Sequence, residues 1–127
     1  MDPNVRDALR RGQLVDITTT GRRTGAPRRI EIVFHPIGGR LYISGMPSRR
    51  TRSWIHNLGA NPRLTLHLKG PVQADLPGRA RIITGRDERR AVLERIARIW
   101  RRPDVDVMVE HSPLIEVVLD DAPAAAA

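Results

Sequence analysis

The chain of 127 residues has no cysteine, a single lysine and only four aromatic side chains. Without cysteine there are no disulfides, thiolate nucleophiles or cysteine-ligated metal sites, which agrees with a reducing cytoplasm. No stretch approaches the roughly 20 apolar residues that a membrane span requires, and the N-terminus lacks the basic and then apolar pattern of a secretory signal. We therefore expect a cytoplasmic protein whose residues 1–127 form a single domain with one core.

Charge is far from balanced, because 22 basic residues against 14 acidic ones give a net charge of +8. Lys69 is the only lysine, so almost all of this charge is guanidinium, which favours phosphate and carboxylate partners. Four aromatic residues are too few for the stacking platforms of single-strand binders, and no helix-turn-helix or ribonucleoprotein signature occurs. Nucleic acid is thus the weakest alternative, and a small anionic molecule is the favoured partner.

Apolar and polar residues alternate in several short segments, which is the pattern of half-buried strands. The predicted strands cover residues 15–19, 30–34, 41–43, 64–68, 72–76, 79–83 and 114–119. A hairpin turn at Pro77 and Gly78 is expected to separate the fifth strand from the sixth. The sequence therefore predicts a mainly β fold with flanking helices, in which six or seven antiparallel strands close into a barrel.

Three helices are expected around these strands. They cover residues 2–12, residues 51–58 and a longer segment from about residue 84 or 87 to 102. The first helix would act as a short lid or flap, and the longest places Val92, Ile96 and Ile99 on one buried stripe. Residues 104–112 carry no clear pattern, and the tail from 120 to 127 is expected to be frayed.

The segment from Thr18 to Arg28, TTTGRRTGAPR, connects the first two predicted strands and carries the clearest chemical signal. Gly21 and Gly25 can adopt positive φ and let backbone N–H groups approach a ligand, while its three arginines suit phosphate or carboxylate. We call residues 18–28 the arginine turn and expect it to bind an anion. The alternative is a solvated turn whose arginines reflect composition alone.

A second motif, WIHNLGANP over residues 54–62, follows after two predicted strands. The two motifs, in this order and at this spacing, resemble the deazaflavin-dependent nitroreductase family of flavin- and deazaflavin-dependent oxidoreductases. The resemblance covers residues 14–119. It implies a split β-barrel, like that of FMN-binding proteins, which binds the deazaflavin coenzyme F420, with FMN as the alternative cofactor.

The resemblance also implies which residues bind the cofactor, when each motif position is matched to this chain. It places Arg22, Arg23, Thr24 and Arg28 at the phosphate and acidic tail, Ser44 and Gly45 beside the ring, and Trp54 and Asn57 on the helix that frames the site. It indicates no catalytic side chain and no metal.

Three of these positions have an alternative structural explanation. Thr24 could satisfy backbone groups of its own turn. Trp54 could pack in the core with Leu58, four residues along the helix. Asn57 could hold the corner that precedes Pro62.

The chain also departs from the family pattern. The loop from Ser44 to Arg50 lacks a lysine that members commonly carry. Family members commonly have a proline in the second strand, which is replaced in this chain around Glu31. The Glu31 carboxylate would repel an acidic cofactor unless it pairs with Arg29 or another arginine. The tyrosines that line the acceptor pocket of reducing members are missing, since Tyr42 is the only tyrosine.

By this resemblance, hydride passes from C5 of reduced F420 to an electron-poor small molecule such as a quinone, enone or nitro compound. None of the four histidines has metal-ligand spacing, and His56 in the second motif is the best candidate for a proton donor. Two other functions stay open: a non-catalytic barrel that holds F420, FMN, haem or a lipid, and a basic nucleic-acid-binding module. A homodimer is also expected.

Overall fold

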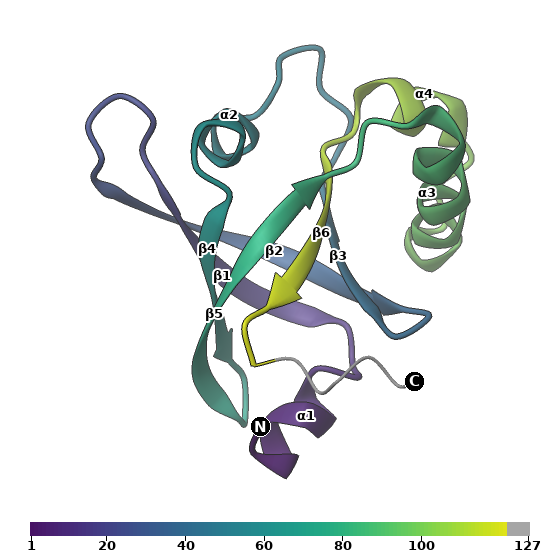
Figure 1. The fold of residues 1–127 in the computed structure, drawn as a ribbon. Coiled ribbons are helices and arrows are strands. Elements are labelled where there is room, and N and C mark those ends of the chain that lie inside the picture. Colours follow the sequence, from purple (N-terminus) through teal and green to yellow (C-terminus); the bar gives the residue numbers. More distant parts are fainter. Residues whose placement is uncertain (122–127) are drawn as a thin grey trace.

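The computed structural model describes residues 1–121, and the part of the expected frayed tail from 122 to 127 lies outside the described residues. Within residues 1–121, ten elements follow one another (Figure 1). They are α1 (Pro3–Ala8), β1 (Gln13–Thr20), β2 (Pro27–Ile37), β3 (Arg40–Ser44), α2 (Ser53–Ala60), β4 (Arg63–Lys69), β5 (Gln73–Ile82), α3 (Arg86–Trp100), α4 (Val105–His111) and β6 (Leu114–Leu119).

The six strands close into one antiparallel barrel in the order β1-β2-β3-β6-β5-β4, with β4 paired back to β1. Alternate residues point inward, so that Val15, Ile17, Phe34, Ile43 and Leu66 form a core from which water is excluded. The prediction of a mainly β barrel with flanking helices is therefore confirmed, with six strands.

A second apolar cluster lies outside the barrel wall, where α3 and α4 pack beside β3 and β6 (Figure 1). The predicted long helix is confirmed, and it buries Val92 and Ile96. Ile99 is 60% exposed, against expectation, because it lies at the edge of the buried stripe. The segment without a clear pattern forms α4, which buries Met108 and Val109.

The predicted hairpin turn at Pro77 and Gly78 is wrong, since both residues lie inside the continuous strand β5. The part of β5 that pairs with β6 begins at Gly78. Pro77 comes one residue earlier, so its missing N–H lies outside the β5–β6 ladder. At Gly78, a Cβ atom would lie 2.7 Å from the carbonyl oxygen of Val118. The glycine here permits close approach of two strands and does not form a turn.

The N-terminal helix is shorter than the predicted range of 2–12. Asp2 caps α1 by accepting hydrogen bonds from the backbone N–H groups of Asn4 and Val5. After the last residue of α1, the Gln13 side chain donates to the carbonyl of Ala8 at 2.9 Å. Its apolar face joins the barrel core at the end opposite α2 (Figure 1), so α1 closes the far end of the barrel.

Candidate active site

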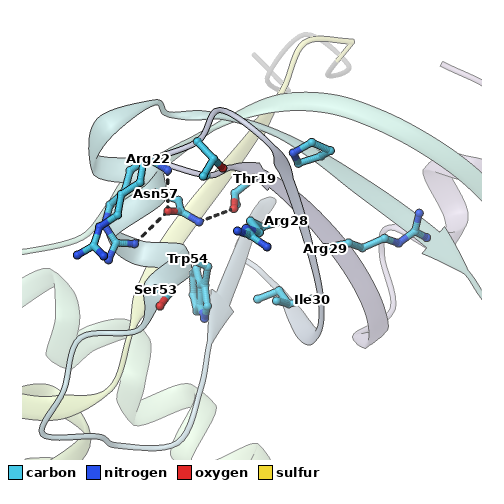
Figure 2. Close-up of a pocket in the computed structure, with 12 residues that line it drawn as sticks. Thr19, Arg22, Arg28, Arg29, Ile30, Ser53, Trp54 and Asn57 are labelled. Carbon is cyan, nitrogen blue, oxygen red and sulfur yellow. Dashed lines mark hydrogen bonds between the residues drawn. The ribbon is translucent and has the colours of Figure 1, made fainter.

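A cavity of about 630 Å³ opens between the arginine turn, the start of β2 and α2, and we call it the first cavity (Figure 2). Its volume lies in the range of small-molecule sites. Six of the eight residues predicted to bind a cofactor line it: Arg22, Arg23, Thr24, Arg28, Trp54 and Asn57. The fold thus brings the two sequence motifs to one concave surface.

Local hydrogen bonds shape the arginine turn. Gly21 and Ala26 are joined by a backbone bond of 2.8 Å, and the Thr24 hydroxyl accepts from the N–H of Ala26 at 3.2 Å. The structural role considered for Thr24 is therefore confirmed. Gly25 has the expected positive φ of 72°, but Gly21 does not. A Cβ on Gly21 would lie 3.1 Å from the carbonyl oxygen of Ala26, so this glycine provides space within the turn.

Asn57 fixes the arginine turn to α2. Its side chain is buried, and its Oδ1 accepts from the backbone N–H of Arg22 at 3.2 Å and from Nη1 of Arg22 at 3.1 Å (Figure 2). Its Nδ2 donates to the hydroxyl of Thr19 at 3.2 Å. The backbone carbonyl of Asn57 also accepts from Asn61, so the corner before Pro62 is held by main chain. The Asn57 side chain therefore orients Arg22 toward the first cavity.

The positive charge of the first cavity is uncompensated. Within residues 1–121, the guanidinium groups of Arg22, Arg23 and Arg28 have no carboxylate oxygen within 4.0 Å. Arg29 differs, because it donates to Asp16 at 2.9 Å and points away from the other arginines (Figure 2). The open arginines fit a phosphate or carboxylate group.

The N-terminal end of α2 adds to this field. Its first residue, Ser53, lines the first cavity, and no side chain caps the helix. The first backbone N–H groups of a helix carry partial positive charge and suit an anion. Helix and turn therefore favour the same ligand chemistry.

Ser44 and Gly45, the two predicted residues beside the ring, line a different cavity of about 340 Å³, which we call the second cavity. Ser44 is buried, and its hydroxyl donates to the carbonyl of Pro113 at 2.6 Å. A Cβ on Gly45 would lie 3.2 Å from Cγ of Pro113, so a larger residue would narrow this space. The structure therefore separates Ser44 and Gly45 from the arginine turn.

Trp54 connects the two cavities, since it lines both. It is also 7% exposed and belongs with Leu58 to the barrel core. The core packing considered for Trp54 is thus present, and it holds the indole rigidly between a basic cavity and a more apolar one.

Glu31 lines the second cavity, and its charge is compensated by a partner that we had not predicted. Its carboxylate pairs with Lys69 and not with an arginine. The Lys69 ammonium also donates to Asp16 at 2.8 Å, and these two carboxylates raise the pKa of Lys69. Glu31 therefore does not leave an unopposed negative charge at the cavity.

Sequence reasoning missed several residues of the second cavity, above all Trp100, Arg52 and Pro113. Trp100 ends α3, and its ring centroid lies 5.3 Å from that of His35. The available signal was a tryptophan in the last turn of an amphipathic helix, one of only two in the chain. His56, by contrast, is exposed and lines neither cavity.

Among residues 1–121 there is no cluster of three or more His, Asp or Glu side chains that could hold a metal. The same residues include no helix that is both long and apolar enough to cross a membrane.

Comparisons with known proteins agree with this geometry. Residues 3–120 match the model of the F420H2-dependent quinone reductase family. An F420-H2-dependent reductase of known structure is 21% identical, with 83% of this chain and 93% of that chain covered and a TM-score of 0.60.

Two further solved structures share the fold. One, described as a domain-swapped dimer, is 21% identical, with 83% of this chain and 79% of that chain covered and a TM-score of 0.60. A conserved hypothetical protein of Mycobacterium tuberculosis is 18% identical, with 94% and 81% covered and a TM-score of 0.71. The expected split barrel is thereby confirmed.

Proposed function

The chain belongs to the F420H2-dependent quinone reductase family and is an F420-dependent reductase; we propose that its acceptor is a quinone or a similar electron-poor molecule, such as an enone or nitro compound. One observation carries the proposal: Trp54 joins a cavity with three open arginines to a second cavity that is lined mostly by apolar side chains. A cofactor with an anionic end and a flat ring, beside an acceptor whose reacting ring is apolar, needs these two environments next to each other.

We propose that the arginine turn holds the phosphate and acidic tail of F420. Arg23 and Arg28 would contribute guanidinium forks that have no partner among the described residues, and Asn57 would keep Arg22 in place. Thr24 would act mainly by shaping the turn, through its bond to the N–H of Ala26. Arginine forks suit phosphate better than the point charge of lysine does.

The ring of F420 would lie against Trp54 and extend toward Ser44 and Gly45. When bound, F420 supplies the hydride that reduces the acceptor. The chain's own residues would orient the ring and the acceptor, with Trp54 and Trp100 lining the space where the two meet. Since His56 lies outside both cavities, the proton that completes quinone reduction would come from solvent.

The experiment follows loss of reduced F420 by absorbance when menadione, an enone or a nitro compound is supplied. We expect stoichiometric oxidation with menadione. A Trp100→Leu variant should raise the KM for menadione by a larger factor than the F420 dissociation constant, because Trp100 lines the second cavity and not the first, where the anionic tail of F420 would bind. F420 binding without turnover of any acceptor would contradict the proposed activity and favour a non-catalytic cofactor-binding barrel.

A homodimer and a cytoplasmic location stay predictions within this proposal. The structure described as a domain-swapped dimer shares the fold of this chain, which supports testing for self-association. Light scattering after size-exclusion chromatography should give twice the mass of one chain, and the mass of one chain would exclude the dimer.

A further inference from the structure

A third cavity of about 310 Å³ lies between the loop after β3, the start of α3 and the end of α4. Arg52 and Pro113 line both the second and the third cavity, whereas no residue lines both the first and the third. The three cavities therefore follow one another, with the second cavity, where we propose that the acceptor is reduced, in the middle. The third cavity is therefore the direct neighbour of the second.

The third cavity is basic. Arg49, Arg50 and Arg52 all line it, and none of them has a carboxylate oxygen within 4.0 Å among residues 1–121. Arg49 and Arg50 are exposed, while Arg52 is half-buried. Three neighbouring guanidinium groups without acidic partners form a site for an anion.

Two other charged side chains line this cavity, and both are already engaged. Arg89 donates to backbone carbonyls at the end of α4, at 2.9 Å to Val109 and 2.6 Å to Ser112. Glu110 forms an ion pair with Arg86 of α3. The acidic residue therefore does not neutralise the three open arginines.

Buried polar atoms give a second, independent indication. Within the described part of the chain, three buried side-chain N or O atoms have no hydrogen-bond partner, and two of them belong to this cavity: Nε of Arg52 and Oγ of Ser112. Ser112 is only 4% exposed, and Arg52 uses one other nitrogen to donate to the Met46 carbonyl at 2.9 Å. Buried donors without partners are costly, so a ligand acceptor that reaches either atom would gain a hydrogen bond.

We propose that the third cavity binds an anionic group of the electron acceptor, such as a carboxylate, sulfonate or phosphate, so that the preferred acceptors are anionic quinones. This inference rests on the proposed function. The acidic tail of F420 is the other source of such a group. The arginine turn that would hold that tail lines the first cavity, which shares no lining residue with the third, so the acceptor is the better match.

The test begins with equilibrium binding of naphthoquinone sulfonate and of unsulfonated naphthoquinone, measured by calorimetry on the protein without cofactor. An Arg49→Ala/Arg50→Ala double variant should bind the sulfonate about tenfold more weakly, because it loses two charged contacts. Ser112→Ala should weaken it about threefold. Unsulfonated naphthoquinone should bind all variants equally well. The matched control is Arg95→Ala/Arg98→Ala, which removes two exposed charges of α3 that line none of the cavities.

Equal sulfonate affinity in the Arg49→Ala/Arg50→Ala variant and the control would overturn the inference, even if F420-dependent turnover is observed. The anion site stands if the variant weakens sulfonate binding, even if no turnover occurs. A final comparison uses F420 and a deazaflavin without phosphate and glutamates. If the Arg49→Ala/Arg50→Ala variant binds F420 more weakly but binds the truncated deazaflavin as well as wild type does, the third cavity binds the cofactor tail and the acceptor assignment is wrong.

Discussion

Three arginines at the rim of the first cavity, Arg22, Arg23 and Arg28, differ from Arg63 and Arg81 on the outer wall of the barrel. Among the described residues, the rim arginines have no acidic partner, whereas these two wall arginines are paired with carboxylates. On the wall, Arg63 makes two bonds to Asp120, at 2.8 and 2.6 Å, and Arg81 pairs with Glu88 and Glu116. At the rim, Arg28 has no carboxylate within 4.0 Å among the described residues. Net charge alone therefore does not identify a binding site. What identifies it is a cation that faces a cavity and lacks an acidic neighbour.

The largest expected effect concerns a rim arginine. Arg28→Ala should weaken F420 binding by about 1.5–3 kcal/mol, the usual loss for a hydrogen bond to a charged group. Arg28→Lys should give an intermediate affinity, because it keeps the charge but loses the planar fork. Fluorescence titration of F420 measures both. Unchanged affinity in Arg28→Ala would remove the rim from the site.

A smaller effect is expected at the residue that holds the rim in place. Asn57→Ala should lower the free energy of unfolding by about 1–2 kcal/mol, since Arg22 and Thr19 lose a buried partner. It should also weaken F420 binding, because Arg22 is no longer oriented. The control is Asn61→Ala, which removes a bond to the N–H of Arg63 outside the cavities. The control should change urea stability alone, and equal F420 affinities in the two variants would contradict a positioning role for Asn57.

The same contrast between partnered and unpartnered groups occurs in two buried histidines. On the wall, Nε2 of His67 lies 2.7 Å from the Thr18 hydroxyl, and its Nδ1 lies 2.6 Å from a carboxylate oxygen of Asp75. The hydrogen bond with His67 lowers the pKa of Asp75. His35 is 3% exposed, its Nε2 has no partner, and burial lowers the pKa of His35 below the ordinary value of 6.5.

His35 predicts a pH dependence of stability. The unfolded chain protonates His35 as the pH falls through about 6.5, whereas the folded chain resists protonation. The unfolded state then binds more protons, so the free energy of unfolding falls toward lower pH. Urea unfolding between about pH 7.5 and 5.5 should show a smaller fall in a His35→Leu variant than in wild type. Parallel curves would mean that His35 does not carry this dependence.

The smallest effect is expected on the wall. Arg63→Ala removes an exposed ion pair, so F420 affinity should stay within experimental error of wild type. Its urea midpoint should shift only at low salt, because added salt screens such pairs. A loss of F420 affinity similar to that of Arg28→Ala would erase the distinction between rim and wall.

Much of the barrel could be predicted from local patterns. The two-residue period of Val15 and Ile17 predicted inward-facing positions, and the composition of the arginine turn predicted an anion site at Arg22, Arg23 and Arg28. These signals are local, whereas Thr24, Trp54 and Asn57 were predicted only through the family resemblance.

What could not be predicted depends on contacts between distant segments. Gly78 looked like a turn residue until its close approach to Val118 was known. Trp100 joins the second cavity only because α3 packs against the barrel wall, and Glu31 meets Lys69 across strand β1. Contacts between such distant residues leave no periodic pattern in the sequence from which they could be predicted.

One titration tests the central claim most directly. F420 affinity is compared between an Arg22→Ala/Arg23→Ala/Arg28→Ala variant and an Arg63→Ala/Arg81→Ala/Arg90→Ala variant, which removes equal charge from paired arginines. We predict a loss of at least about a hundredfold in the first variant and retention of affinity in the second. Equal affinities in the two variants would show that overall charge, and not the cavity rim, attracts the cofactor.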